Sequence, residues 1–250
     1  MTKSLDLRFS TPCAACPLRA LDVVFSKKPQ DIAFIQQLKI GERRVRPGAS
    51  IIDEHAKSEH LYTLLSGWAF RFKTFDDGRR QITDYATPGD LIGLQAALFG
   101  EMTHGVEALT DTVLCVFPRE KFWSLFEKDA SLAFDVTWLG AHAEVALERQ
   151  LLSIGRRRAV ERAAYLLWYV FDKARDIGLV KNDRLALPMT QIHLADTLGL
   201  SVVHTNKTLQ LLRERKIVTL DDRQLAVHDE PALRQLGKVE DLADAGRPLI

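Results

Sequence analysis

The stretch TQIHLADTLGLSVVHTNKTLQLLRERKIV, residues 190–218, decides the fold of the C-terminal part of this chain. Thr190 and Ser201 are residue types that cap the N-termini of helices, and Gly199 lies between them. The stretch therefore predicts a first helix, a turn at Gly199 with a positive φ, and a second helix. Thr205, Leu209 and Leu212 recur at spacings of four and three and mark the inner face of that second helix.

The order of these residues favours a helix-turn-helix over an ordinary αα-hairpin, which is the alternative. Ala195 is small at the point where the two helices cross, as a close crossing requires. Residues 217–220, 221–224 and 225–227 then read IVTL, DDRQ and LAV, a strand, a turn and a strand. We therefore predict a winged helix-turn-helix, whose second helix fits the DNA major groove.

The outer face of the second helix supplies the candidate DNA-contacting residues. Lys207 can donate to the acceptors of guanine, whereas Val203 can only contact a thymine methyl group. Asn206 can read adenine or bond a phosphate, and Val202 either touches a base or is simply a residue at the helix end. Three further positions are better placed for backbone phosphates: Thr190, Ser201 and His204.

The residues before this motif indicate a second, mostly β, domain. Between residues 41 and 118, short apolar or alternating runs are separated by turn signals such as Pro47-Gly48, Asp77-Gly78 and Pro88-Gly89. Helical spacing resumes over 119–128 and continues as a long helix from about 129 to 153, with two apolar rows. One row can cover the β-domain, and the other can meet an identical helix of a second subunit, although burial within a monomer is the alternative.

Bulk properties exclude several classes of protein. The chain has 250 residues, enough for two domains, and a formal net charge of +1, so that only local clusters of basic residues indicate nucleic acid. These clusters are Arg156–Arg158 and the set Lys207, Arg213, Arg215 and Lys216. No apolar leader and no membrane-length apolar run is present, so we expect a cytoplasmic protein without membrane partners. We find no P-loop, nucleophile elbow, HExxH pattern or paired carboxylates and expect no enzyme.

Four segments together resemble the Crp/Fnr family of bacterial transcription regulators: CAACPLR at 13–19, PGDLIG at 88–93, LLSIGRRRAVERAAYLL at 151–167, and 187–218. The resemblance implies an α+β fold with an N-terminal cyclic-nucleotide-binding-like β-roll, a long dimerisation helix and a C-terminal winged helix-turn-helix. The implied boundaries are a cysteine-containing leader at 1–30, a sensor domain at 31–128, the dimerisation helix at 129–155, the DNA-binding domain at 156–235 and a flexible tail at 236–250.

The resemblance implies a homodimer that binds double-stranded DNA at a palindromic site and recruits or blocks RNA polymerase. The leader is similar to the oxygen-related Fnr/FixK side of the family, which favours a response to oxygen or redox state. The family commonly has glutamate and arginine at the positions of Val203 and Lys207, so the usual half-site is in doubt here. The alternative function is a ligand- or redox-sensing module that acts mainly through protein contacts.

Two effectors can be weighed against the residues present. The family's cyclic-AMP pocket uses Gly-Glu-Leu and Arg-Ser, but this chain has Gly93-Leu94-Gln95 and no arginine over 101–107, so we expect no cyclic AMP. Cys13, Cys16 and Cys115 match cluster ligands of the Fnr branch, yet a four-cysteine iron–sulfur cluster needs one more thiolate.

Other readings of the sensor domain stay open. A non-cysteine fourth ligand, a cluster shared across the dimer or a [2Fe–2S] variant would overcome the missing thiolate. The cysteines can instead be a buried strand residue and a redox-active or vestigial dithiol. A haem ligand among His55, His60 and His104 has no support from spacing, and a protein without any effector is a further alternative.

Overall fold

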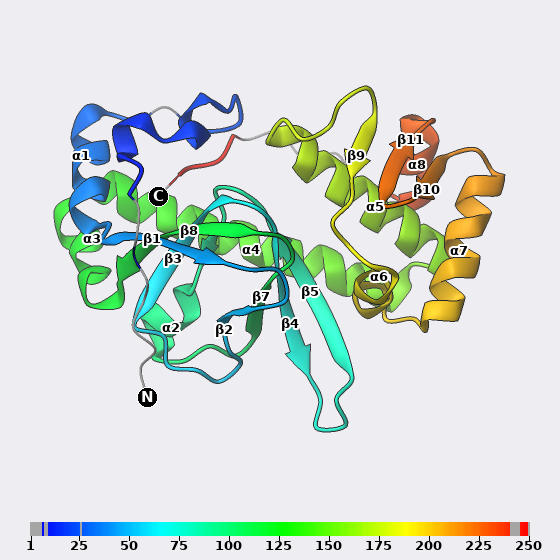
Figure 1. Ribbon diagram of the computed structural model, residues 1–250, viewed down its shortest axis with the longest axis horizontal. Helices are drawn as coiled ribbons and strands as arrows, with labels where there is room; N and C mark the ends of the chain where they lie inside the picture. The colour runs from blue at the N-terminus through cyan, green and yellow to red at the C-terminus, as the bar shows by residue number, and fades with distance from the viewer. Residues whose placement is uncertain (1–6, 8–9, 26, 241–245, 250) are drawn as a thin grey trace. The chain divides into compact units, whose positions relative to one another are not determined.

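The computed structural model describes residues 7, 10–25, 27–240 and 246–249. The chain divides into two compact units, which are described in turn (Figure 1). The first comprises Met1–Lys73, Ala86–Glu144 and Gly246–Ile250, and the second comprises Thr74–Tyr85 and Val145–Ala245. Among the described residues, no helix is long and apolar enough to cross a membrane.

The first unit is built on antiparallel strands in two sheets, with strand orders β1-β8-β3-β6 and β2-β7-β4. Its strands are β1 (Gly41–Val45), β2 (Ser50–Ile52), β3 (His60–Ser66), β4 (Ala69–Thr74), β6 (Leu91–Ile92), β7 (Gly105–Ala108) and β8 (Thr112–Pro118); β5 (Arg80–Ala86) falls almost wholly within the residues of the second unit. Every apolar run seen in the sequence is a strand. The sequence did not reveal β1, β7 or the short helix α2 (Leu94–Phe99).

An apolar core lies within this β-roll because the strands alternate their side chains between two faces. Leu64, Val106, Leu114 and Val116 are fully buried in one cluster that draws on both sheets. The turn from β3 to β4 needs Gly67, whose φ is +89° and where a Cβ atom would lie 2.3 Å from the carbonyl oxygen of Asp111. The β-roll prediction is therefore confirmed.

Helices precede and follow the β-roll in the sequence. The first, α1 (Pro29–Leu38), follows the leader, and the short turn η3 (Arg119–Lys121) and α3 (Trp123–Lys128) follow β8. Asp31 is of a residue type that favours N-caps, but it does not cap α1: the helix begins at Pro29 with Lys28 as N-cap and no side-chain cap. Proline at the first helical position already has a suitable φ and lacks the N–H group that a cap would satisfy.

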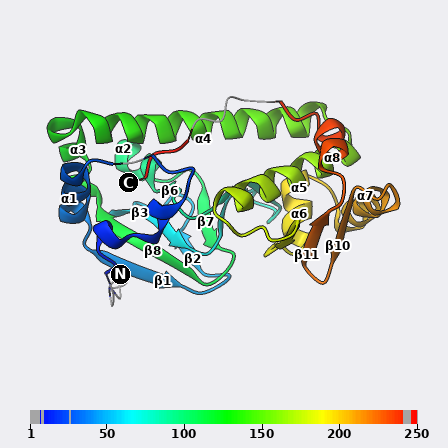
Figure 2. The same ribbon diagram turned by 90° about the horizontal axis from the view of Figure 1, so that it is seen from above.

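The long helix α4 runs without a break from Ala130 to Arg156 (Figure 2). The helix continues through Gly155, and only Arg157 and Arg158 separate it from α5 (Ala159–Asp176). One predicted row packs on the sensor core through Leu132 and Val136. The other row leaves its large apolar side chains Phe134 and Leu152 exposed.

The leader is held to the β-roll by a buried ion pair. Lys39 Nζ lies 2.8 Å from Glu42 Oε1 and also donates to the carbonyl oxygen of Thr11 at 2.7 Å. The backbone N–H of Thr11 donates to the same Glu42 oxygen at 2.6 Å. Two 3₁₀ turns follow, η1 (Cys13–Ala15) and η2 (Pro17–Ala20). The irregular leader is thus attached through its backbone, which its sequence did not indicate.

The second unit gathers its elements around α5. It contains α6 (Gln191–Leu198), α7 (Val202–Glu214), α8 (Glu230–Gly237) and a sheet ordered β10-β11-β9. The wing strands β10 (Val218–Asp221) and β11 (Gln224–Val227) turn at Asp222 and Arg223, whose φ angles of 48° and 60° suit a tight hairpin. The winged helix-turn-helix prediction is confirmed, with β9 (Arg184–Ala186) as an additional third strand.

Two predicted features of this region need correction. Arg157 was grouped with the basic residues facing DNA, but it is buried and donates to the carbonyl oxygens of Gly237 at 2.8 Å and Lys238 at 3.0 Å. It therefore caps the C-terminal end of α8. The tail was expected to be flexible over 236–250, but residues 246–249 pack on the first unit; 241–245 and 250 lie outside the described residues.

The packing of α8 on α5 leads to a stability prediction. A Cβ atom at Gly237 would lie 2.9 Å from the backbone nitrogen of Tyr165, whereas Gly155 in α4 has open space and no positive φ. We expect Gly237→Ala to lower the free energy of unfolding by about 1–3 kcal/mol through overpacking. Gly155→Ala should raise it by about 0.5–1 kcal/mol. Urea unfolding followed by circular dichroism measures both, and equal effects of the two variants would contradict this packing.

The Lys39–Glu42 pair gives a second prediction. Burial raises the pKa of Glu42, but the hydrogen bonds from Lys39 and Thr11 outweigh it and leave this pKa below its usual 4.5. The stabilisation is thus present above pH 4.5 and is lost as the pH falls through the lowered pKa. Glu42→Gln should cost about 3 kcal/mol at pH 7 because it leaves a buried ammonium unpaired. The double variant with Lys39→Met should recover most of this loss, and no recovery would refute the pairing.

Candidate nucleic-acid interface and cysteine pocket

The helix-turn-helix is fixed by two side-chain caps and one glycine. Thr190 Oγ1 accepts from the N–H of His193 at 3.3 Å, and Ser201 Oγ accepts from the N–H of His204 at 3.2 Å. Gly199 has φ 63° and ψ 38°, the left-handed conformation expected from the sequence. Each hydroxyl oxygen accepts one helix N–H, and its own proton remains available to donate a hydrogen bond outward.

The two faces of α7 differ as the spacing predicted. Thr205 and Leu212 are fully buried and Leu209 is half-buried. Thr208 is buried as well, which the apolar spacing missed because its hydroxyl bonds within the helix, to the carbonyl oxygen of His204 at 2.8 Å. The opposite face carries the exposed side chains expected to contact DNA: Val202, Val203, His204, Asn206 and Lys207. Val203 is 66% exposed, too much for a core residue.

A residue of α6 orients one of these side chains. Asn206 Nδ2 donates to Gln191 Oε1 at 3.1 Å, across the turn between the two helices. This bond uses one of the two donors of the amide and leaves the other donor and the carbonyl oxygen available. The sequence analysis did not single out Gln191, although its place directly after the cap Thr190 was a usable signal.

A groove of about 840 Å³ lies between α6, α7 and the wing, and its lining includes Gln191, Val202 and Asn206. Arg213, at its wing side, pairs with Asp221 at 3.0 Å. Both partners are 60% exposed, so the pair contributes little to stability, but it occupies Arg213. Of the candidate DNA-contacting side chains on α7, Val202 and Asn206 line this groove, and Val203 and Lys207 do not. Figure 1 shows α6, α7 and the wing strands that border it.

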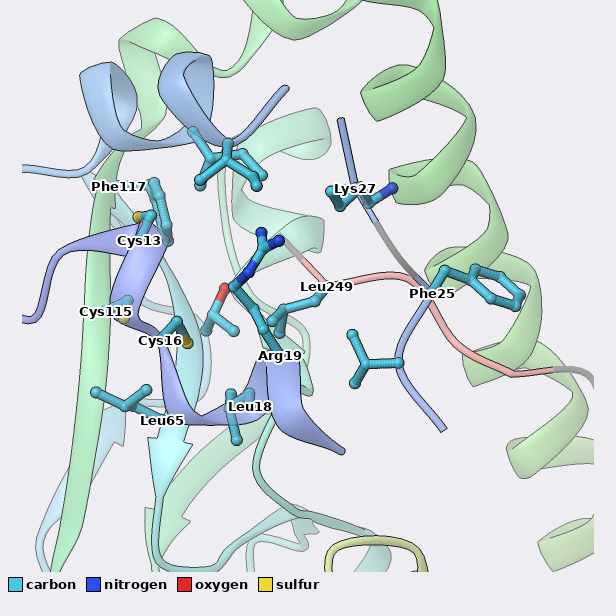
Figure 3. Close-up of a pocket in the computed structure, with 14 residues that line it drawn as sticks. Cys13, Cys16, Leu18, Arg19, Phe25, Lys27, Leu65, Cys115, Phe117 and Leu249 are labelled. Carbon is cyan, nitrogen blue, oxygen red and sulfur yellow. The ribbon is translucent and has the colours of Figure 1, made fainter. Parts of the chain in front are cut away.

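The three cysteines lie around one small cavity of the first unit (Figure 3). Cys115 comes from β8, Cys13 begins η1, and Cys16 lies between η1 and η2. The cavity measures about 60 Å³, and its other lining residues include Leu18, Arg19, Leu65, Phe117 and Leu249. The sequence linked the three cysteines only through resemblance, and the structure brings them together.

Burial governs the acidity of these thiols. It raises the pKa of Cys115 to about 11, against the opposing effect of the Lys39 ammonium. Burial also raises the pKa of Cys13. Both thiols are therefore protonated near neutral pH, and metal binding must first remove these protons at a cost.

This donor set does not fit a four-cysteine iron–sulfur cluster. The chain contains three cysteines, and a fourth thiolate is absent from its sequence. Among the described residues, no group of three or more histidine, cysteine, aspartate or glutamate side chains is arranged to hold a metal ion. Two of the histidines considered for haem lie in different surroundings. His55 is an exposed turn residue. His60 is partly buried, and this burial lowers its pKa.

The region expected to lack a cyclic-nucleotide site is closed by its own side chains. Gln95 Oε1, at the position of the family's glutamate, accepts from the N–H and the hydroxyl of Thr103 at 3.1 and 2.8 Å. Met102 next to it is buried. The Gln95 and Thr103 side chains thus bond each other, and the neighbouring cation, Lys73, is already engaged by the carbonyl oxygen of Thr103 and by Glu54.

From this arrangement we expect no binding of cyclic AMP. The midpoint of thermal unfolding should stay unchanged when about 1 mM cyclic AMP is added. A ligand that did bind, at about 100 times its Kd, would stabilise the protein by about 2.7 kcal/mol and raise this midpoint. Calorimetric titration provides an independent measurement. A saturable heat of binding, abolished by Gln95→Ala, would contradict the assignment of this region as closed.

Comparisons with known proteins agree with this architecture. Residues 42–129 match the cyclic nucleotide-binding domain family, and residues 161–236 match the Crp-like helix-turn-helix domain family. The nitrogen fixation regulation protein FixK of Azorhizobium caulinodans is 30% identical over 194 residues, 75% of each chain. The transcriptional activator protein FnrL of Cereibacter sphaeroides is 25% identical over 240 residues, 95% of each.

The solved structure of FixK2 from Bradyrhizobium japonicum superposes with a TM-score of 0.71 at 26% identity, covering 80% of this chain and 98% of that one. A regulator of the CRP family from Thermus thermophilus, at 18% identity and a TM-score of 0.68, shares the fold over 80% of this chain and 99% of its own. Fold, motif and relatives agree, and the chain belongs to the Crp/Fnr family of transcription regulators, on its Fnr/FixK side.

Proposed function

We propose that this protein is a homodimeric, sequence-specific DNA-binding transcription regulator that inserts the outer face of α7 into the major groove. The observation that carries the proposal is the exposed set Val202, Val203, Asn206 and Lys207 on a helix whose opposite face is buried. A helix held at its inner face with a capped, exposed N-terminal turn is the geometry that a major groove accepts.

The side chains support a specific division of roles. Lys207 donates to guanine, Val203 contacts a thymine methyl group, and Asn206, oriented by Gln191, pairs with adenine through its remaining donor and its carbonyl oxygen. Thr190, Ser201 and His204 bond backbone phosphates, and Val202 flanks the reading face. A lysine lacks the bidentate fork of arginine, so its guanine contact discriminates less sharply than the family's arginine.

The dimer is part of the same proposal. Several large apolar side chains of α4 are exposed in the single chain: Phe134, Leu147, Leu151 and Leu152. A second copy of this helix would bury them as in a coiled coil. Two copies related by a two-fold axis read half-sites about one DNA turn, ~34 Å, apart, so the target is palindromic. RNA polymerase is the downstream partner, and the cytoplasm is the site of action.

Selection from random double-stranded DNA, followed by gel-shift titration at several salt concentrations, tests this function. We expect a palindromic preference and a salt-dependent affinity, because phosphate contacts release counterions. Lys207→Ala should weaken specific binding by about 1–3 kcal/mol. Gln191→Ala should relax the preference at the adenine position alone.

Lys128→Ala serves as the matched control, since this exposed lysine at the end of α3 lies in the other unit. It should leave affinity and sequence preference unchanged. Binding without salt dependence or sequence preference would instead favour the alternative, a sensing module that acts through protein contacts.

A further inference from the structure

The C-terminal segment Gly246–Leu249 is bound to the leader through its backbone. The N–H of Arg247 donates to the carbonyl oxygen of Val23 at 2.6 Å, and the N–H of Phe25 donates to the carbonyl oxygen of Arg247 at 2.9 Å. These two bonds form a parallel β-bridge between Val24 and Arg247. Two segments from opposite ends of the sequence thus pair as strands do.

The side chain of Arg247 reaches the turn before β6. Its guanidinium donates to the carbonyl oxygen of Pro88 at 3.0 Å and lies 3.3 Å from a carboxylate oxygen of Asp90. Both charged side chains are less than a fifth exposed. A charge-assisted bond at this degree of burial is stronger than an exposed surface pair.

The seat is shaped for this segment. A Cβ atom at Gly89 would lie 2.3 Å from the Arg247 guanidinium, and a Cβ atom at Gly246 would lie 2.8 Å from the Phe25 ring. Leu249 is buried in the apolar cluster that contains Leu18 and Phe117. The close contacts at Gly89 and Gly246 and the burial of Leu249 show that the segment is packed into the first unit.

Leu249 and Cys16 line the same cavity (Figure 3). At about 60 Å³ this cavity has room for a few water molecules and no larger group. A substituent on the sulfur of Cys16 would therefore compete with the Leu249 side chain for space.

We propose that the leader and the turn before β6 form a seat for the chain's own segment Gly246–Leu249, and that seating of this segment and modification of Cys16 by small thiol-reactive molecules exclude each other. Cys13 and Cys16 are both half-buried in the leader, whereas Cys115 is buried in β8. The raised pKa values of Cys13 and Cys115 further reduce the reactivity of those thiols.

The chemical class of the modifier is a low-molecular-weight disulfide. The Cys16 thiol releases its proton to solvent, its thiolate attacks one sulfur of the disulfide, the S–S bond of the reagent breaks, and a small thiolate leaves. The product is a mixed disulfide on Cys16, which requires Leu249 to leave the cavity. By linkage, seating must disfavour this product by the same factor by which the product disfavours seating.

Alkylation of the full-length protein by iodoacetamide, followed for each cysteine by peptide mass spectrometry, measures the first half of the proposal. Deletion of residues 247–250 should accelerate alkylation of Cys16 about tenfold. Arg247→Ala should accelerate it roughly fivefold. Each change removes part of the free energy that keeps the C-terminal segment in its seat. Arg46→Ala, an exposed arginine of the same unit, should leave the rate unchanged.

Two outcomes would overturn the proposal. One is an equal rate at Cys16 in the deletion variant and the wild type. The other is a parallel rise at Cys13, Cys16 and Cys115 with loss of circular dichroism, because this would show unfolding of the leader rather than opening of a seat.

The reverse direction provides an independent measurement. Protein carrying glutathione on Cys16 should lose its C-terminal residues to carboxypeptidase roughly tenfold faster than reduced protein, because the segment spends more time unseated. Cys16→Ser protein treated in the same way should show no acceleration. An unchanged rate in glutathionylated protein would refute the mutual exclusion. Neither readout requires DNA, so this proposal and the proposed function can fail separately.

Discussion

The burial of α5 is the constraint on which the second unit depends. Ala163, Ala164 and Phe171 are at most 1% exposed, and α6, α7 and α8 all pack on this helix. Burying a side chain of the size of Phe171 contributes about 1.5–3 kcal/mol, and alanines at the other positions let neighbouring backbones approach closely. At Gly237 this approach reaches the limit, since only a hydrogen fits between α8 and the backbone of Tyr165. The orientation of α7 therefore follows from packing behind it, and its outer face is free to vary.

That separation explains how the chain keeps the family scaffold while carrying an unusual reading face. Thr205 and Leu212 are fixed by burial, and the caps at Thr190 and Ser201 are fixed by unsatisfied N–H groups at the helix ends. Val203 and Lys207 meet no such demand within the protein. In the proposed mode of recognition, substitutions at these positions would change the sequence that is read while the helix stays held in the same way. Recognition can diverge while the fold does not.

Patterns with a clear physical period could be read from the sequence. The alternating strands, the capped helices and the turn at Gly199 were predicted because each depends on neighbours in the chain. The strands β1 and β9 carry charged residues and lie outside the apolar runs, so alternation did not reveal them. Arg157 looked like part of a basic cluster, since no sequence pattern shows that it caps α8 across 80 residues. The pairing of Gln191 with Asn206 and the meeting of the three cysteines are likewise long-range consequences of packing.

The sensor unit retains the β-roll of its family and has replaced the chemistry inside it. Gln95 and Thr103 bond each other where the family places groups for a cyclic nucleotide, and the cysteines lack the fourth thiolate that a cluster needs. At both places the residues of this chain therefore differ from those that the family uses. The leader is nevertheless held by the buried Lys39–Glu42 pair, and burying both charges carries a desolvation cost. The leader also receives the chain's C-terminal segment beside its thiols. In the proposed exclusion between the C-terminal segment and modification of Cys16, the leader and its seat are the responsive part of the sensor unit, and the β-roll supports them.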